Sequence, residues 1–208
     1  MERMMSGIAL SALASTVGAL TLNFDQDAPG RLPNGWLAGV TGRGSQQWSV
    51  EADASAPSAP NVLKQSGKGD FPWCVRSDTS VADGFVETRF KPLSGREDQA
   101  GGLIWRWRDG NTYYVARANA LENNLSLYYV QNGRRITIKY VDAPVARNQW
   151  HLLRVDFDGS RIRVALNGVV YIEADDGHIA GPGRVGLWTK ADSITLFDDF
   201  SYATAERK

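Results

Sequence analysis

Apolar and polar residues alternate along most of the chain after residue 84. Runs such as FVETRF (85–90), GLIWRW (102–107) and TYYVAR (112–117) are short and rich in aromatic and β-branched residues. No window repeats apolar residues at the i, i+3, i+4 and i+7 spacing of an amphipathic helix, so the pattern predicts strands. Further strands are expected at 61–65, 125–130, 135–140, 150–157, 161–166, 169–173, 184–189 and 194–200.

Turn-forming residues separate these runs. Asn-Gly or Asp-Gly pairs occur at 132–133, 158–159 and 167–168, and RDGN occupies 108–111. Asn, Asp and Gly readily adopt the positive φ values that tight hairpins require. About ten short strands joined by hairpins predict an all-β fold, an antiparallel sandwich or barrel. The segment 53–72, rich in Ala, Pro, Ser and Gly, is expected to be a loop around its one short strand.

The N-terminal segment carries a targeting pattern. One early arginine is followed by a weakly apolar stretch that Ser, Thr and Gly interrupt, so it is unlike a membrane span of about 20 apolar residues. Ala12-Leu13-Ala14 has the small-x-small spacing of a signal-peptidase site. We expect 1–22 to be a signal peptide or an N-terminal extension, 23–203 to be one domain and 204–208 a tail. Export from a bacterial cell to the periplasm or the exterior is the favoured interpretation, and a misassigned start codon is the alternative.

Composition and charge narrow the function classes. The 208 residues suit one domain, and 23 Lys and Arg residues balance 23 Asp and Glu residues. A nucleic-acid or membrane-surface binder needs an excess of cations, so neither partner is expected. One cysteine excludes a disulfide framework and a cysteine zinc cluster, and two histidines leave little room for a histidine metal site or catalytic triad.

Strand side chains alternate between two faces, so the predicted strands can be sorted by face. Three residues of 102–108 form a wholly apolar face and are assigned to the core: Leu103, Trp105 and Trp107. The same test assigns to the core Ile136, Ile138 and Tyr140. If the consecutive strands between 85 and 140 pair as a meander, their outward side chains gather on one surface, which carries Glu87, Arg89, Arg106, Tyr113, Arg117, Tyr128, Thr137 and Lys139.

This outward surface suits a saccharide. Arginine offers a planar fork of donors, and tyrosine offers an apolar ring with a polar tip. Glu87 is the single acid among four cations of the set. Loops and strand ends add further polar and aromatic side chains, which completes the predicted ligand-binding residues: Arg89, Arg106, Tyr113, Arg117, Glu122, Tyr128, Lys139, Trp73, Trp188 and Lys190. The alternatives are the ordinary polar face of an antiparallel sheet and a structural domain that contacts another protein.

Several of these runs are shared with a known group. GFVETRFKPLSG (84–95), GGLIWR (101–106), NTYYVAR (111–117), WHLLRV (150–155) and GRVGLW (183–188) make residues 23–203 resemble the concanavalin A-like (laminin G-like) jelly-roll domains of bacteria. Within that group the chain is most similar to the domain family named for 3-keto-disaccharide hydrolase. The resemblance implies an antiparallel two-sheet jelly-roll sandwich, often exported, that handles carbohydrate on its concave sheet. It also implies that Arg106 and Arg117 contact the ligand.

Catalytic chemistry is not evident. Retaining glucanases of this superfamily carry Glu-x-Asp-x-x-Glu on one strand, whereas the two partial matches here, at 51–56 and 173–178, end in Ala56 and His178. We therefore favour a carbohydrate-binding domain without catalysis. The alternative is a glycoside hydrolase acting on a keto-sugar or uronic-acid disaccharide, with Glu87 or Glu122 as the acid/base.

No cofactor is expected, with one open exception. Calcium could bind oxygen ligands from Asp25, Asp27 and Asp199 if the first and last strands adjoin.

Overall fold

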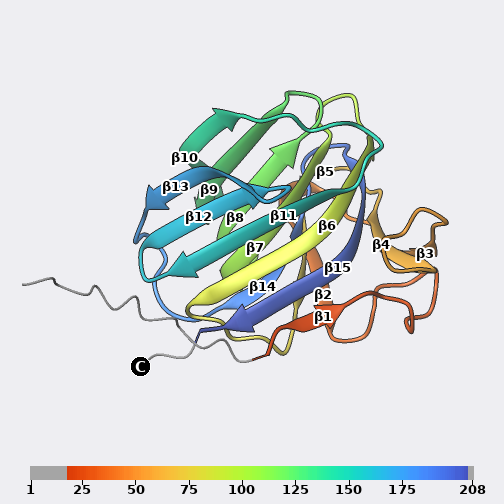
Figure 1. The fold of residues 1–208 in the computed structure, drawn as a ribbon, viewed down its shortest axis with the longest axis horizontal. Helices are drawn as coiled ribbons and strands as arrows, with labels where there is room; N and C mark the ends of the chain where they lie inside the picture. Colours follow the sequence, from red (N-terminus) through yellow and green to blue (C-terminus); the bar gives the residue numbers. More distant parts are fainter. Residues whose placement is uncertain (1–17, 206–208) are drawn as a thin grey trace, which may run out of the picture.

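A computed structural model describes residues 18–205, and the regular structure of this range consists of strands without a helix (Figure 1). Their bounds are β1 Leu20–Leu22, β2 Trp36–Gly44, β3 Trp48–Ala52, β4 Asn61–Gln65, β5 Gly69–Arg76, β6 Gly84–Ser94, β7 Ala100–Asp109, β8 Thr112–Asn119, β9 Asn124–Gln131, β10 Arg134–Asp142, β11 His151–Asp158, β12 Arg161–Leu166, β13 Val169–Asp175, β14 Arg184–Trp188 and β15 Ile194–Thr204. A helix able to cross a membrane is therefore not found in the described part of the chain.

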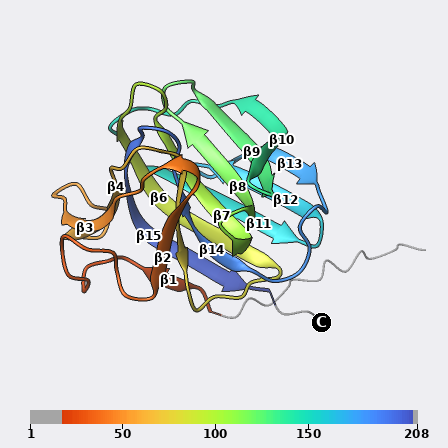
Figure 2. The ribbon, with the colours of Figure 1, turned by 180° about the vertical axis from the view of Figure 1, so that it is seen from behind.

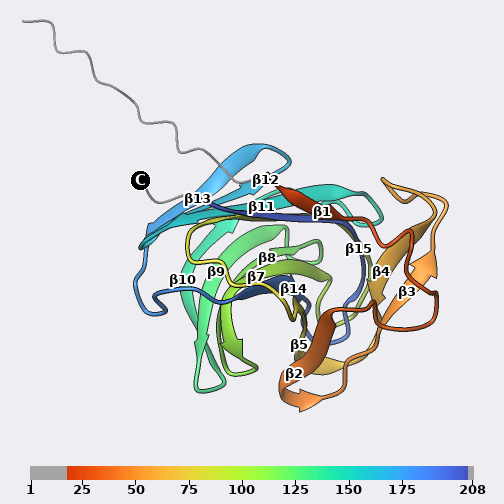
Figure 3. The same cartoon turned by 90° about the horizontal axis from the view of Figure 1, so that it is seen from below.

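The strands form two antiparallel sheets. One has the order β13-β12-β11-β6-β15-β4-β3, with β1 beside β15, and the other has the order β10-β9-β8-β7-β14-β5-β2. Figure 3 shows the second sheet curling so that its concave side faces away from the first, and Figure 2 brings this sheet to the front. We call the first the convex sheet and the second the concave sheet. The predicted two-sheet jelly-roll sandwich is confirmed.

The main core lies between the sheets. Inward side chains of the concave sheet, such as Leu103 and Trp105, pack against Val86, Phe157 and Phe197 of the convex sheet, and all are buried. Trp105 stacks on Phe157 with ring centroids 5.9 Å apart. Burial of such side chains supplies the main stabilisation, about 25 cal/mol for each Å² of apolar surface removed from water.

Every predicted strand is present, and β1, β2, β3 and β5 were not predicted. Strand β2 contains three glycines, at 39, 42 and 44, which weaken its strand pattern, and at Gly39 an added Cβ would lie 2.4 Å from the indole of Trp73. Residues 1–17, which hold most of the predicted signal segment, lie outside the described residues. The remainder of that segment contains β1, which pairs with β15, so the domain begins by Leu20.

The predicted meander is wrong at its first strand. Strand β6 lies in the convex sheet between β11 and β15, because the chain crosses to the other sheet between β6 and β7. Glu87 and Arg89 therefore lie on the opposite face of the molecule from β8 and β9. There Glu87 pairs with Arg154 at 3.4 Å, and Arg89 pairs with Asp199 at 3.4 Å.

Bulges reverse the predicted faces in two strands. In β7 the pairing with β8 is interrupted after Trp105, and Arg106 has a φ of 49°. As a result Arg106 turns inward and is only 2% exposed, while Trp107 joins the concave face. Both residues were predicted on the other side, because alternation assumes an uninterrupted ladder.

The second bulge lies in β10 between Thr137 and Lys139. This bulge turns Lys139 away from the concave face. Lys139 Nζ donates to the Glu173 backbone oxygen of β13 at 3.1 Å. Tyr140, predicted in the core, instead pairs with Ser126 and is 52% exposed. Ile136 is also exposed rather than buried, because β10 is an edge strand.

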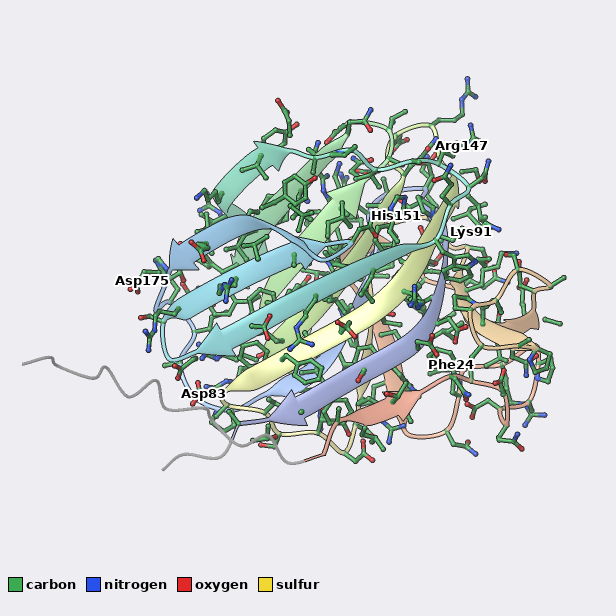
Figure 4. The ribbon with its side chains drawn as sticks, in the orientation of Figure 1. Phe24, Asp83, Lys91, Arg147, His151 and Asp175 are labelled. Atoms are coloured by element: carbon green, nitrogen blue, oxygen red, sulfur yellow. The ribbon has the colours of Figure 1, made fainter. Side chains whose placement is uncertain are left out.

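His151 begins β11 and is buried with both ring nitrogens hydrogen-bonded (Figure 4). Asn167 Oδ1 accepts from the Leu152 amide at 2.9 Å, so Asn167 Nδ2 must donate to His151 Nδ1, 3.0 Å away. The proton of the neutral ring then lies on Nε2, which donates to the Ala146 oxygen at 2.9 Å. A long-range ¹⁵N–¹H NMR spectrum should show the Nε2–H tautomer, and an Nδ1–H pattern would refute this network.

Candidate functional site

Large side chains fill the hollow of the concave sheet. They form a second buried cluster, separate from the main core, with Phe71 and Trp73 partly exposed beside it; its members are Val75, Ile104, Trp107, Tyr113, Val115, Tyr128, Val130 and Trp188. Phe71 stacks on Trp188 with ring centroids 5.7 Å apart. We call this set the hollow cluster. Trp188 and Tyr113, predicted to face a ligand, are in the hollow but wholly buried by their neighbours.

Strands from distant parts of the concave sheet meet across the hollow. Thr41 of β2 and Tyr113 of β8 share a hydrogen bond between their hydroxyls at 2.8 Å, although three strands separate β2 from β8 in the sheet. Burial raises the pKa of Tyr113 to about 12, so its phenol stays neutral. The floor of the hollow around Tyr113 is therefore packed by protein side chains.

One margin carries a network of charged and polar side chains, the Arg117 cluster, which consists of Asp98, Arg117, Glu122, Asn124, Tyr140 and Lys190. The Arg117 guanidinium donates to Glu122 Oε2 and Asn124 Oδ1, both at 2.8 Å, and lies 3.3 Å from Asp98 Oδ2. Asn124 Nδ2 in turn donates to Tyr140 Oη at 2.8 Å. Strands β8, β9 and β10 thus bring three of these side chains together at one end of the sheet.

The cluster has a buried base and an open rim. The Asp98 side chain is 0% exposed, and burial raises the pKa of its carboxyl, although Arg117 and Lys190 oppose that shift. Glu122 is 41% exposed. Burial alone would raise the pKa of Glu122, but the hydrogen bond from Asn124 and the charge of Arg117 outweigh it and hold that pKa below its usual value. Glu122, Tyr140 and Lys190 form the rim.

Arg135 of β10 lies at the centre of the hollow. Its guanidinium carbon is 4.3 Å from the ring centroid of Tyr128, 4.8 Å from that of Phe71 and 5.9 Å from that of Trp188. The Arg135 side chain therefore bridges the hollow from β10 to β5. Its Nη1 is buried and has no hydrogen-bond partner within residues 18–205.

The structure gathers seven of the predicted residues around this hollow: Trp73, Tyr113, Arg117, Glu122, Tyr128, Trp188 and Lys190. It separates from them Arg89, Arg106 and Lys139, together with the catalytic candidate Glu87.

Sequence reasoning missed several residues of the site. Alternation with Thr137 and Lys139 puts Arg135 on the outward face as well, but nothing local marks it as a ligand contact. Asn124 and Tyr140 are positioned by pairing with neighbouring strands, and Asp98 lies in the connection between β6 and β7. No local pattern marks an aspartate in such a connection, so its pairing with Arg117 is visible only in three dimensions.

The acids considered for calcium are not gathered at one point. Asp199 pairs with Arg89, and Asp25 Oδ1 accepts from the Asn61 amide at 3.0 Å. Within the described range, no group of three or more Asp, Glu, His or Cys side chains is arranged to hold a metal ion.

Comparisons with known proteins agree with the fold. No protein-family model matches the chain. Over 130 residues, 62% of the chain, it is 24% identical to a levanase of Bacillus subtilis (strain 168), and the match spans 19% of the length of that protein. Among solved structures, the carbohydrate-binding module CBM66 from Bacillus subtilis has a TM-score of 0.65 and 20% identity, covering 83% of this chain and 96% of the module.

A Bacillus licheniformis beta-glucanase has a TM-score of 0.61 and 14% identity, covering 92% of this chain and all of the glucanase chain (100%). These likenesses show the concanavalin A-like jelly-roll fold that the sequence resemblance implied. The narrower resemblance to the 3-keto-disaccharide hydrolase family is not shown by them.

Proposed function

We propose that this chain is a carbohydrate-binding domain and that its saccharide contacts the Arg117 cluster and the neighbouring aromatic margin of the concave sheet. The observation that carries the proposal is the open rim of Glu122, Tyr140 and Lys190, which buried Arg117, Asn124 and Asp98 hold in place, respectively. Saccharide hydroxyls both donate and accept hydrogen bonds, and the rim offers a carboxylate, a phenol and an ammonium group. Phe71 and Trp73 supply partly exposed aromatic surface nearby.

The similar proteins support a saccharide ligand. Both the levanase and the carbohydrate-binding module are carbohydrate proteins by name, and the fold of this chain matches that module over most of its length. Levan, the uncharged polysaccharide that gives levanase its name, is therefore one of the ligands to test, beside charged saccharides. We place the domain outside the cytoplasm, on the targeting pattern of its N-terminal segment.

The surroundings of the two candidate acids, Glu87 and Glu122, favour a binding function over glycoside hydrolysis. Glu87 lies on the convex sheet in an ion pair with Arg154. The pKa of Glu122 is held below its usual value, whereas the general acid of a glycosidase needs a raised pKa to stay protonated.

Replacing Glu122 by glutamine, or Tyr140 by phenylalanine, should weaken saccharide binding about tenfold, since a hydrogen bond to a charged group contributes about 1.5–3 kcal/mol and one to a neutral group contributes about half of that. The wild-type protein is first screened on a glycan array that includes levan oligosaccharides. Affinities are then measured by isothermal titration calorimetry with the best ligand.

Glu87→Gln is the matched control, because it makes the same chemical change on the convex sheet and should leave affinity unchanged. Binding that both rim variants retain would refute this site, and an array without any saccharide signal would refute the function. Release of reducing sugar by the wild type that Glu122→Gln abolishes would instead establish the hydrolase alternative.

A further inference from the structure

Arg135 differs from the cations of the Arg117 cluster in having no carboxylate partner within residues 18–205. Arg117 and Lys190 are in direct contact with two carboxylates, those of Asp98 and Glu122. Arg135 is a third cation, and in the part of the chain that the structure describes it forms neither an ion pair nor a hydrogen bond. Asp98 influences Arg135 only through its longer-range field, because its own contacts go to Arg117 and Lys190. The positive charge of Arg135 is thus not balanced by any carboxylate in contact with it among residues 18–205.

The surroundings of Arg135 make this charge costly. Burial disfavours the charged form and lowers the pKa of Arg135. The aromatic rings at 4.3 and 4.8 Å offer cation–π contact, worth about 0.5–2 kcal/mol, but they accept none of the five in-plane N–H groups. Besides Asp98, the ionisable groups that act on the guanidinium are the cation Arg117, which repels it, and the phenols of Tyr113 and Tyr128; Tyr113 stays neutral with a pKa of about 12. The donors of Arg135 therefore lack an anionic acceptor.

A carboxylate or sulfate group on a ligand would supply the anionic acceptor that Arg135 lacks. Either group accepts two parallel N–H bonds from a guanidinium, and such charge-assisted pairs are about twice as strong as neutral hydrogen bonds. A neutral diol would satisfy the donors but leave the charge uncompensated. Arg135 also lies close to the proposed saccharide site, because the guanidinium groups of Arg135 and Arg117 are 4.3 and 5.8 Å from the same Tyr128 ring.

We propose that the saccharide bound on the concave sheet is anionic and that its charged group, a uronate carboxylate or a sulfate ester, binds Arg135. This inference rests on the proposed saccharide-binding function and adds the chemical class of the ligand. In this arrangement the Arg117 cluster binds hydroxyl groups of the saccharide. Arg135 binds its charged group and so selects anionic over neutral saccharides.

The test is a glycan array in which each acidic oligosaccharide is printed beside its neutral counterpart. Uronates are paired with their carboxyl-reduced forms, and sulfated glycans with their desulfated forms. The wild type should bind acidic members at least about tenfold more tightly, which corresponds to one charge-assisted contact. The kind of pair that shows the preference distinguishes a carboxylate ligand from a sulfate ligand.

Two variants assign the preference to Arg135. Arg135→Gln should remove it, and binding to the acidic glycan should then equal binding to its neutral partner. Arg134→Gln is the matched control, because Arg134 is the adjacent, exposed residue of the same strand and its loss changes net charge equally. It should retain the preference.

Two further measurements test the inference if the Arg135→Gln variant unfolds. They are the glycan preference of Arg135→Lys and the salt dependence of wild-type binding. The lysine variant keeps the charge but not the planar fork, so it should show a reduced preference, and added salt should weaken acidic binding more than neutral binding. Equal wild-type binding to both members of each pair overturns the inference and leaves the saccharide function standing. Binding to no glycan overturns both.

Discussion

Arg106→Gln should lower the free energy of unfolding by about 3–5 kcal/mol, the usual cost of removing one partner from a buried ion pair. The Arg106 guanidinium donates to the backbone oxygens of Ala82, Ile179 and Gly159, at 3.1, 2.9 and 2.6 Å, and lies 3.3 Å from Asp83 Oδ1. It therefore ties three separate connections together at the end of the sandwich where Asp83 lies (Figure 4). Glutamine is shorter and has fewer donors, so buried carbonyl groups would lose their partners.

Urea denaturation of the wild type and of the Arg106→Gln variant measures this loss of stability. Arg161→Gln is the control, since Arg161 forms an exposed pair with Asp158 nearby and should change stability by less than about 1 kcal/mol. A loss below that level for Arg106→Gln would contradict a structural role. At temperatures where the Arg106 variant is folded, its saccharide affinity should equal that of the wild type, because the side chain does not reach the concave face.

Asp98→Asn should have a stability cost of similar size, about 3–5 kcal/mol, because it leaves the buried Arg117 without one of its carboxylates. Removing both charges, in Asp98→Asn with Arg117→Met, should cost less than the two single changes together. A double-mutant cycle measured by urea denaturation should therefore give a coupling of at least about 1 kcal/mol. Additive effects would show that the two side chains do not interact.

Arg106 and Arg117 have different roles, although each is the last residue of a run on which the family resemblance rests, GGLIWR (101–106) and NTYYVAR (111–117). Arg106 is held by backbone oxygens inside the sandwich, whereas Arg117 orients the exposed rim of a polar cluster. The Arg106 guanidinium is bonded to protein oxygens and does not reach the concave face, so the ligand contact that the resemblance implies for it is not part of the proposed site. For Arg117 it stays a prediction, which the rim variants test.

The filled hollow also changes where a ligand is expected. Sequence reasoning predicted an open cationic and phenolic surface, but Tyr113 and Trp188 are wholly buried and serve to pack the curled sheet against itself. The groups that remain available are Glu122 and Tyr140 at one margin and Arg135 within the hollow. Two of these three were not among the predicted contacts.

The sequence by itself determined the strands and the hairpins. Alternation within 85–90 or 112–117 and Asn-Gly at 132–133 are local signals, because each depends only on residues a few positions apart. They were sufficient for an all-β sandwich and for placing Arg117 and Tyr128 on the outer side of one sheet, away from the main core.

The tertiary structure decided which strands are neighbours and which cations are neutralised. The crossing between β6 and β7 separated Arg89 from Arg117, and bulges in β7 and β10 exchanged Arg106 with Trp107 and Lys139 with Tyr140. One inserted residue reverses every later side chain of a strand, and whether it occurs depends on the partner strand and on contacts between residues far apart in the chain. The pairing of Asp98 with Arg117, and the absence of any such partner for Arg135 among residues 18–205, arise in the same way.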